Sequence, residues 1–401
     1  MNSLARVRRV SKATEHVYWG AFVVLLQRPY NVGMSKPDEH SRRDFLQGRA
    51  AVRVAAAKTQ AWVDSTSELL EARLAKDPAA TEPVAHVYAS RRAMACEFAV
   101  QYHEADGEIQ EIVLAALDKI ESIEALLTIY RDRSEVIEIN QRAADGPVEV
   151  DNEIFALLQL SDRLYHETTG AFDITSGPLS RAWGFLQRAG RLPAVAEIEA
   201  ALAKVGGDQV QLDAEAKTVS FRQSGVEINF NSIGKGYALD QAAALLNAAG
   251  HRDYLWHGGG SSVLACGSNR ASRDECWTLG LRHPLAPEKR LLEFHLCDCA
   301  LATAGGATQF FEHEGRRFSH ILDPRTGWPA DGVLTATVLA PTAALADGLA
   351  TAFFVMSVET VEEYCLLHPE IGAVLVCPTD ASPSFTVRVF GLKEADWTRC
   401  E

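Results

Sequence analysis

A strand-to-helix junction at residues 231–236 constrains this sequence more than any other feature. Residues 226–230 (VEINF) alternate as a strand does, the run NSIGKG follows at once, and residues 237–249 continue as an alanine-rich helix. A helix that begins right after a strand points backbone N–H groups and the positive end of its dipole at the turn. The pattern predicts a phosphate-binding turn, although a tight turn that merely opens the next helix fits the same residues.

The composition of this turn and of the whole chain excludes two classes of function. Only Lys235 separates the two glycines, so the G-x-x-x-x-G-K-[ST] pattern of nucleotide triphosphatases is not matched. The formal charge is −14, from 39 basic and 53 acidic side chains, which repels polyanions, and no nucleic-acid partner is expected. A phosphorylated ligand would need local neutralisation by a metal, a helix N-terminus or a few cations.

Residues 85–398 are predicted to form one catalytic domain of the α/β (α+β) class. Alternation predicts strands at residues 86–90 and 96–103, joined by a turn at Arg91 and Arg92. Helices are predicted at residues 109–127, 152–168, 343–354 and 358–368. Further strands are predicted at residues 210–212, 218–222, 254–256, 262–265, 277–282, 291–295, 300–304, 335–339, 373–377 and 385–390.

Residues 1–84 differ in character and are predicted to be a leader, helical or partly disordered. The apolar run at 21–26 is too short to cross a bilayer, and no transmembrane segment is predicted in the chain. The run SRRDFLQ at 41–47 resembles the core of a twin-arginine export signal. Charged residues between 49 and 58 interrupt the apolar segment that such a signal needs, so residues 50–74 are predicted to form a surface helix. We expect a cytoplasmic protein without a lipoprotein anchor; twin-arginine export is the alternative.

The eight cysteines include no C-x-x-C pair and no zinc-type spacing with histidine. Buried or free thiols are therefore predicted. Cys297 and Cys299 are two residues apart and would share one face of a strand, where core packing is predicted.

Two segments carry side chains suited to chemistry. Asp347 and Thr351 are four apart on a predicted helix, so a carboxylate and a hydroxyl lie on one face. Such oxygen ligands suit magnesium, whereas capping of the helix start is the structural alternative. The run HILDPRTG at 320–327 crowds an imidazole, a carboxylate, a guanidinium and a hydroxyl into one turn. His320 suits proton transfer or phosphate binding, while an Asx turn at Asp323 and an ordinary surface cation remain equally compatible.

Two glycine-containing segments complete the set. Residues 169–175 (TGAFDIT), followed by Trp183, combine a permissive backbone with aromatic rings suited to lie beside a planar ligand. Core packing of these aromatic rings is equally acceptable. Residues 257–261 (HGGGS) permit close approach to a ligand or form a plain turn.

In this order, the segments resemble the FAD:protein FMN transferase family, also called ApbE flavin transferases. The resemblance spans roughly residues 87–390 and is carried by these runs: Met94, YRDRSE at 130–135 with Asn140, GAFDIT at 170–175, IGKGYALD at 233–240, GGG at 258–260, ATAG at 302–305, residues 320–327 and residues 347–351. It implies a T-fold-like α/β fold with a mixed sheet and packed helices, FAD as substrate and a magnesium ion.

The resemblance also implies roles for individual residues. The metal ligands would be Ser232, Asp347 and Thr351. FAD would be contacted by Met94, Tyr130, Ala171, Phe172, Asp173, Asn229, Lys235 and Ile321. The catalytic residues would be His320, Asp323 and Thr326, with the histidine moving the proton.

The implied reaction transfers FMN from FAD to a Thr or Ser hydroxyl of an acceptor flavoprotein subunit and releases AMP. Position and electrostatics dominate such phosphoryl transfers. Two alternatives stay open: hydrolysis of FAD to FMN and AMP at the same site, and a carrier that binds FAD without cleaving it.

Overall fold

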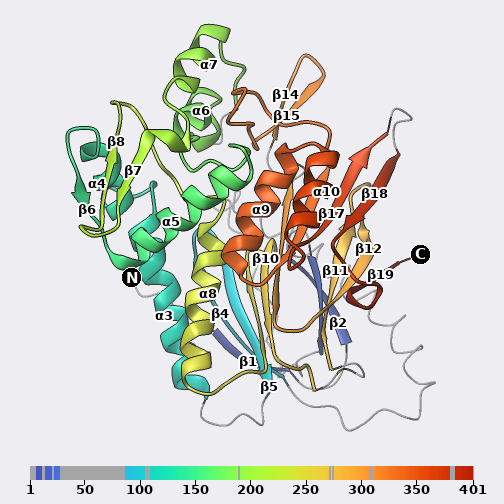
Figure 1. The fold of residues 1–401 in the computed structure, drawn as a ribbon. Coiled ribbons are helices and arrows are strands. Elements are labelled where there is room, and N and C mark those ends of the chain that lie inside the picture. The colour runs from blue at the N-terminus through green and yellow to red at the C-terminus, as the bar shows by residue number, and fades with distance from the viewer. Residues whose placement is uncertain are drawn as a thin grey trace, which may run out of the picture.

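The central strands are apolar at nearly every position, so both faces of their sheet are covered. In β10 (Ser262–Cys266), Leu264 packs into the core beneath the helices, whereas Val263 and Ala265 pack into a second core against another sheet. The result is a helix layer, a nine-stranded sheet and a five-stranded sheet (Figure 1).

The computed structural model describes residues 6–10, 14–19, 22–27, 86–103, 109–187, 190–270, 272, 275–306, 310–379 and 384–400. For the first three ranges only the backbone is described. The twin-arginine run at 41–47 and the helix expected at 50–74 lie outside the described residues. Membrane-spanning helices are absent from the described part of the chain, because none of its helices combines the necessary length and apolar character.

The nine-stranded sheet has the order β1-β4-β5-β9-β10-β13-β16-β17-β18, and its neighbouring strands all pair antiparallel. Besides β10 its strands are β1 (Arg6–Val10), β4 (His86–Ala93), β5 (Cys96–His103), β9 (Tyr254–Gly258), β13 (Cys299–Gly305), β16 (Thr335–Ala340), β17 (Gly372–Pro378) and β18 (Phe385–Phe390). The expected α/β (α+β) class is confirmed, but the sheet is antiparallel where a mixed sheet was predicted.

The second sheet has the order β19-β12-β11-β3-β2. Its strands are β2 (Thr14–Trp19), β3 (Phe22–Gln27), β11 (Trp277–His283), β12 (Ala286–Leu296) and β19 (Trp397–Arg399). Three strands of the leader thus pair with strands of the two sheets, which the sequence analysis did not predict. A disulfide joins Cys276 to Cys297 across β11 and β12, so the prediction of thiols is wrong for these two cysteines.

Two small sheets lie away from the stack. β6 (Val148–Glu149), β7 (Val210–Asp213) and β8 (Thr218–Phe221) form one, and the hairpin of β14 (Phe310–His313) and β15 (Arg316–Ser319) forms the other. The strands β7 and β8 were predicted, whereas β14 and β15 were not.

Helices α3, α8 and α9 lie side by side over one face of the nine-stranded sheet (Figure 1). The described helices are α3 (Ile109–Leu127), α4 (Glu135–Arg142), α5 (Asn152–Glu167), α6 (Gly177–Ala182), α7 (Val195–Leu202), α8 (Gly234–Ala248), α9 (Ala343–Val355) and α10 (Val358–Leu367). The buried residues of α3 recur every three or four positions, as its apolar pattern predicts. In α9, 10 of 13 residues are buried, so this helix is enclosed by its neighbours.

Two local predictions need correction. Residues 226–230 do not form a strand; this extended segment makes a single parallel bridge between Glu227 and Ser176. The turn between β4 and β5 is made by Met94 and Ala95, both with positive φ (48° and 60°), because Arg91 and Arg92 belong to β4 itself.

Candidate functional site

The first turns of α8 and α9 are in direct contact. A Cβ placed on Gly236 would lie 2.0 Å from the carbonyl oxygen of Ala343 and 2.7 Å from the nitrogen of Ala344. No side chain fits in that space, so Gly236 is required here by the packing of one helix on another.

Asp347 links three elements at this point. Its Oδ2 accepts a hydrogen bond from the Gly236 N–H (2.7 Å), and its Oδ1 accepts one from the Ser262 hydroxyl at the start of β10 (2.5 Å). Ile233, the N-cap residue of α8, makes no side-chain cap bond, and Asp347 supplies a cap from the neighbouring helix. The capping alternative is therefore wrong for its own helix, where Thr342 is the N-cap.

Asp240 of α8 makes the reciprocal contact. Its two carboxylate oxygens accept hydrogen bonds from Ala343 N (2.8 Å) and Ala344 N (2.9 Å), the first two N–H groups of α9. Each helix thus caps the start of the other with one aspartate. We call the set of Gly236, Asp240, Ala343, Ala344 and Asp347 the α8–α9 crossing.

The crossing concentrates negative charge in a buried place. Asp347 is 6% exposed, and burial raises its pKa, an effect that the charge of Lys235 opposes. Burial likewise raises the pKa of Asp240 to about 7, and the charge of Asp347 adds to that shift. Burial raises the pKa of the neighbouring Cys96 thiol to about 11. A bound cation would therefore be favoured beside Asp347, because it would offset the cost of burying this carboxylate.

Most backbone donors of the NSIGKG turn already have partners. The N–H of Asn231 donates to the Asn229 side chain, those of Ile233 and Gly234 donate to the Phe230 carbonyl, and that of Gly236 donates to Asp347. Among the described residues, this leaves the N–H groups of Ser232 and Lys235 for a phosphate.

The predicted FAD contacts border this turn. Asn229 N donates to the carbonyl of Ile174 (2.8 Å), which holds the GAFDIT segment beside the turn. Asn231 Nδ2 donates to the hydroxyl of Tyr130 (3.0 Å), whose side chain is exposed. Ala171 and Phe172 are buried in the main core, and Phe172 and Ile233 both pack against Gly348 of α9. The aromatic ring of Phe172 therefore has the packing role that the sequence left open.

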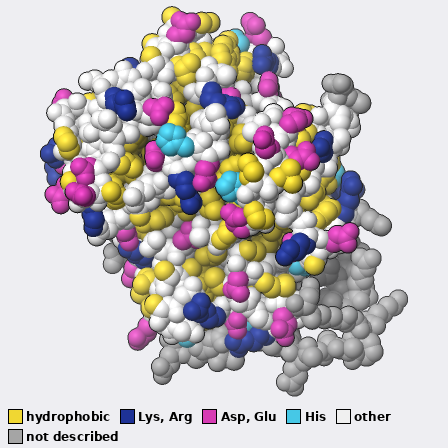
Figure 2. Space-filling view, in the orientation of Figure 1, with side chains coloured by type: hydrophobic (Ala, Val, Ile, Leu, Met, Phe, Trp, Pro, Cys, Tyr) yellow, Lys and Arg dark blue, Asp and Glu magenta, His cyan; other side chains and the backbone are white. Residues whose placement is uncertain are grey.

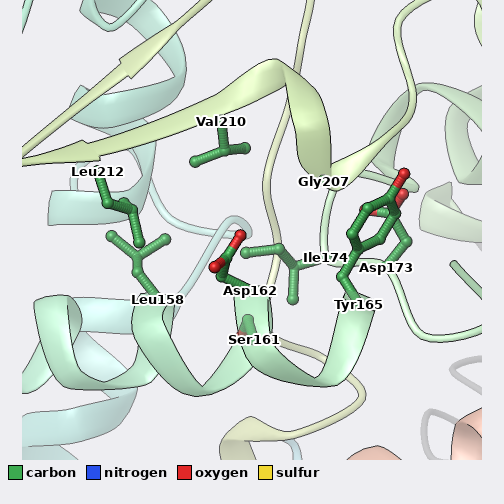
Figure 3. A pocket seen from close by; sticks show the side chains of 9 residues that line it. All are labelled: Leu158, Ser161, Asp162, Tyr165, Asp173, Ile174, Gly207, Val210 and Leu212. Carbon is green, nitrogen blue, oxygen red and sulfur yellow. The ribbon is translucent and has the colours of Figure 1, made fainter. Parts of the chain in front are cut away.

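Asp173 is hydrogen-bonded within its own turn. Its carboxylate accepts hydrogen bonds from the backbone N–H (2.7 Å) and hydroxyl (2.6 Å) of Thr175, and burial raises its pKa to about 6. It lines a shallow pocket between α5 and β7 (Figure 3). None of the other predicted site residues lines this pocket, which is lined by Leu158, Ser161, Asp162, Tyr165, Asp173, Ile174, Gly207, Val210 and Leu212.

Residues 320–327, which we call the His320 loop, are shaped by hydrogen bonds within the loop. The Asp323 carboxylate accepts from the backbone N–H, Nε and Nη2 of Arg325, each at 2.9 Å. The Thr326 hydroxyl accepts from Trp328 N at 3.3 Å. These contacts favour the Asx-turn role for Asp323 and give Thr326 a role in the same turn.

The His320 loop lies at the far end of α9 from the crossing. Arg325 Nη2 donates to the carbonyl of Val355, the last residue of the helix (3.4 Å). The half-buried ring of His320 stands edge-on to Phe185, with 6.5 Å between ring centroids. Ile321 next to it is buried. Thr351 lies on α9 between the two ends, and its hydroxyl donates to the Asp347 carbonyl (3.2 Å).

The structure thus groups most of the predicted site residues around one helix. Lys235, Asp347 and Thr351 lie at or near the crossing, and Ser232 lies in the turn that leads into it. Met94 lies in the turn that leads into Cys96, beside Lys235. Sequence reasoning missed Ser262 and Asp240 as site residues. The available signal for Asp240 was its position four residues after Gly236, as the only acidic residue of α8.

Comparison with known families identifies the family to which this chain belongs. The model of the ApbE family matches residues 94–375. This chain belongs to the ApbE family. A FAD:protein FMN transferase of Haemophilus influenzae is 31% identical over 303 residues, which cover 73% of this chain and 86% of that protein.

Solved ApbE structures share the fold. The ApbE protein of Thermotoga maritima aligns with a TM-score of 0.67 and 29% identity, over 75% of this chain and 96% of that one. The flavin transferase ApbE of Vibrio cholerae aligns with a TM-score of 0.66 and 26% identity, over 77% of this chain and 98% of that one. The resemblance inferred from the motifs is therefore confirmed at the level of family and fold.

The residues around Asp347 fit a magnesium ion of the kind expected for this ApbE protein. They offer a buried carboxylate and hydroxyl oxygens, and Mg²⁺ prefers such ligands, together with waters and phosphate oxygens. No cluster of three or more His, Cys, Asp or Glu side chains suited to a metal occurs among the described residues. The donor set therefore suits an ion that shares its coordination with a phosphorylated substrate.

Proposed function

We propose that this ApbE-family protein is a magnesium-dependent FAD:protein FMN transferase. It cleaves FAD, joins the FMN phosphate to a Thr or Ser hydroxyl of an acceptor flavoprotein subunit through a phosphoester bond, and releases AMP. One observation carries the proposal. The carboxylate of Asp347, on α9, is buried against the start of α8 beside Lys235.

The proposed roles combine the family resemblance with the positions of the residues. Asp347, with Thr351 and Ser232, would hold the cation at the diphosphate, and Lys235 would add a positive charge beside it. Tyr130 is exposed at the edge of the turn and suits contact with a planar ring. When bound, the magnesium ion would offset negative charge on the phosphate oxygens.

The transfer step breaks one P–O bond and forms another. The acceptor oxygen attacks the FMN-side phosphorus, the P–O bond to the bridging oxygen breaks, and AMP leaves with that oxygen. We assign the proton of the acceptor hydroxyl to His320, because an imidazole is the most common general acid–base group, whereas Asp323 and Thr326 accept hydrogen bonds within the turn. Asp323 and Thr326 hold the His320 loop in shape.

The distribution of charged side chains on the visible surface is compatible with the proposed substrates, FAD and an acceptor protein. Figure 2 shows acidic and basic side chains intermixed over this face, without a broad basic patch. The net charge of −14 points the same way and gives no support for a nucleic-acid partner.

The decisive experiment incubates the protein with FAD, MgCl₂ and candidate acceptor subunits and analyses the products by mass spectrometry. Covalent FMN on the acceptor, with AMP in solution, is the expected result. FMN and AMP without an adduct would establish the hydrolase instead, and intact FAD would establish the carrier. Asp347→Asn serves as the matched inactive control, because it removes the charge at nearly constant size.

A further inference from the structure

The α8–α9 crossing has an internal symmetry that the metal site alone does not require. On α8, Gly236 and Asp240 are four residues apart and face α9; on α9, Ala343 and Asp347 are four residues apart and face α8. In each pair the first residue donates its backbone N–H and the last accepts with its carboxylate. The two helices are therefore fixed to each other at two points, one turn apart.

The first turn of α9 depends on Asp240 more than on its own cap. Asp240 accepts from the N–H groups of Ala343 and Ala344, whereas the Thr342 side chain accepts only from Leu345 N (3.3 Å). Asp347 lies one turn after Ala343 on this rigid helix. A shift of the first turn would carry the Asp347 carboxylate with it, away from the Ser262 hydroxyl and the Gly236 N–H.

We propose that Asp240 is a positioning residue for the cation-binding carboxylate of Asp347. It acts through the backbone of α9 and touches neither the cation nor FAD. The proposal rests on the proposed function, in which Asp347 holds the magnesium ion. Residues behind a metal ligand commonly change metal affinity about 10- to 100-fold when substituted.

The chain offers a matched control for simple loss of a helix cap. Asp240→Asn and Thr342→Ala both weaken capping at the start of α9, but only the first removes an acceptor oxygen and a charge from the link to α8. Asp240→Glu keeps a carboxylate and serves as the conservative variant. All three are compared with the wild type at pH 8, after circular dichroism has shown that they are folded.

The experiment measures FMN transfer against Mg²⁺ concentration and, separately, binding of Mg²⁺ alone by isothermal titration calorimetry. Asp240→Asn is expected to raise the Mg²⁺ concentration for half-maximal transfer and the Kd for Mg²⁺ by about tenfold, with kcat at saturating Mg²⁺ changed less than about threefold. Asp240→Glu should recover part of this loss. Thr342→Ala should leave both Mg²⁺ values within about twofold of the wild type.

Equal Mg²⁺ values for Asp240→Asn and Thr342→Ala would overturn the positioning role, since Asp240 would then be only a helix cap. The proposed function would survive that result. A wild type that neither binds Mg²⁺ nor transfers FMN would instead overturn the proposed function, and the positioning role with it. If Asp240→Asn does not fold, the same comparison is decided with Asp240→Glu, whose Mg²⁺ values must then exceed those of Thr342→Ala.

Discussion

The two ends of α9 hold candidate residues in opposite ways. At the α8–α9 crossing, Asp347 is buried and Asp240 half-buried, and each carboxylate accepts hydrogen bonding from the backbone of the other helix. At the His320 loop, the side chains of Asp323 and Arg325 are 16% and 41% exposed and bind mainly to each other. A single substitution at the crossing therefore disturbs two helices, whereas one in the loop disturbs a turn.

This difference suggests a division of labour within the proposed reaction. A diphosphate and its cation need fixed ligands, which packed helices supply. Proton transfer to and from a protein acceptor needs a group that a large partner can reach, which a surface loop supplies. Substitutions at the crossing should therefore cost both stability and transfer, and substitutions in the loop should cost transfer alone.

The largest effect is expected for Gly236→Ala. Its Cβ would meet backbone atoms of Ala343 and Ala344 that cannot move independently of α9, so we expect a loss of about 1–3 kcal/mol in unfolding free energy and loss of transfer. Urea denaturation and the transfer assay measure the two. Gly146→Ala is the control, because its Cβ would meet open space and should change stability by about 0.5 kcal/mol or less. Equal stability of the two variants would refute the packing argument.

His320→Ala tests the His320 loop, the second region of the comparison. We expect transfer to fall by about 10²–10⁴-fold, the usual contribution of a general acid–base group, with unfolding free energy nearly unchanged. The measurement is kcat for FMN transfer at saturating Mg²⁺, together with the urea midpoint. Full activity in this variant would remove His320 from the mechanism.

The sequence predicted the helices and central strands well because their signals are local. The apolar spacing of α3 predicts its observed bounds, Ile109–Leu127, and the start of α8 lies only three residues before the predicted one. Short elements such as α4 (Glu135–Arg142) were missed, although Ser134 does cap this helix as its residue type suggests. Eight residues give too little periodicity to distinguish a helix from a loop.

The candidate site was predicted in part, and the missing part depends on long-range contacts. Ser262 directly follows the HGGGS run, opens an apolar strand and gains its role from Asp347, which is 85 residues away. The partners of Asp240 are more than 100 residues away. The disulfide between Cys276 and Cys297 depends on the pairing of β11 with β12, which cysteine spacing alone does not reveal.

A smaller loss of transfer is expected for Asp323→Asn. This variant separates the role of Asp323 from that of His320 within the loop. Asn can still accept a hydrogen bond from Arg325 but loses the charge of the ion pair, and exposed pairs contribute only about 0.2–1 kcal/mol. We expect transfer to fall by less than about tenfold, far less than for His320→Ala, with an unchanged urea midpoint. A loss as large as that of His320→Ala would give Asp323 a direct part in proton transfer.

The last prediction concerns the pH dependence of stability at the crossing. Burial raises the pKa of Asp240 to about 7, against about 3.9 in an unfolded chain. Because the folded pKa is the higher one, the contribution of Asp240 to stability is complete below pH ~4 and is lost as the pH rises through 7. Asp240→Asn cannot ionise, so its unfolding free energy minus that of the wild type should increase from pH 4 to 7 and level off above pH ~8.

Urea denaturation from pH 4 to 9, without Mg²⁺, measures this difference. Thr342→Ala, which weakens the same helix end without removing a titratable group, should differ from the wild type by a constant amount over that range. The sign is informative because a solvated aspartate at a helix start would give the opposite slope: its pKa would be lowered, and its contribution to stability would grow with pH. A flat or opposite pH dependence for Asp240→Asn would mean that burial does not raise the pKa of this carboxylate in the folded protein.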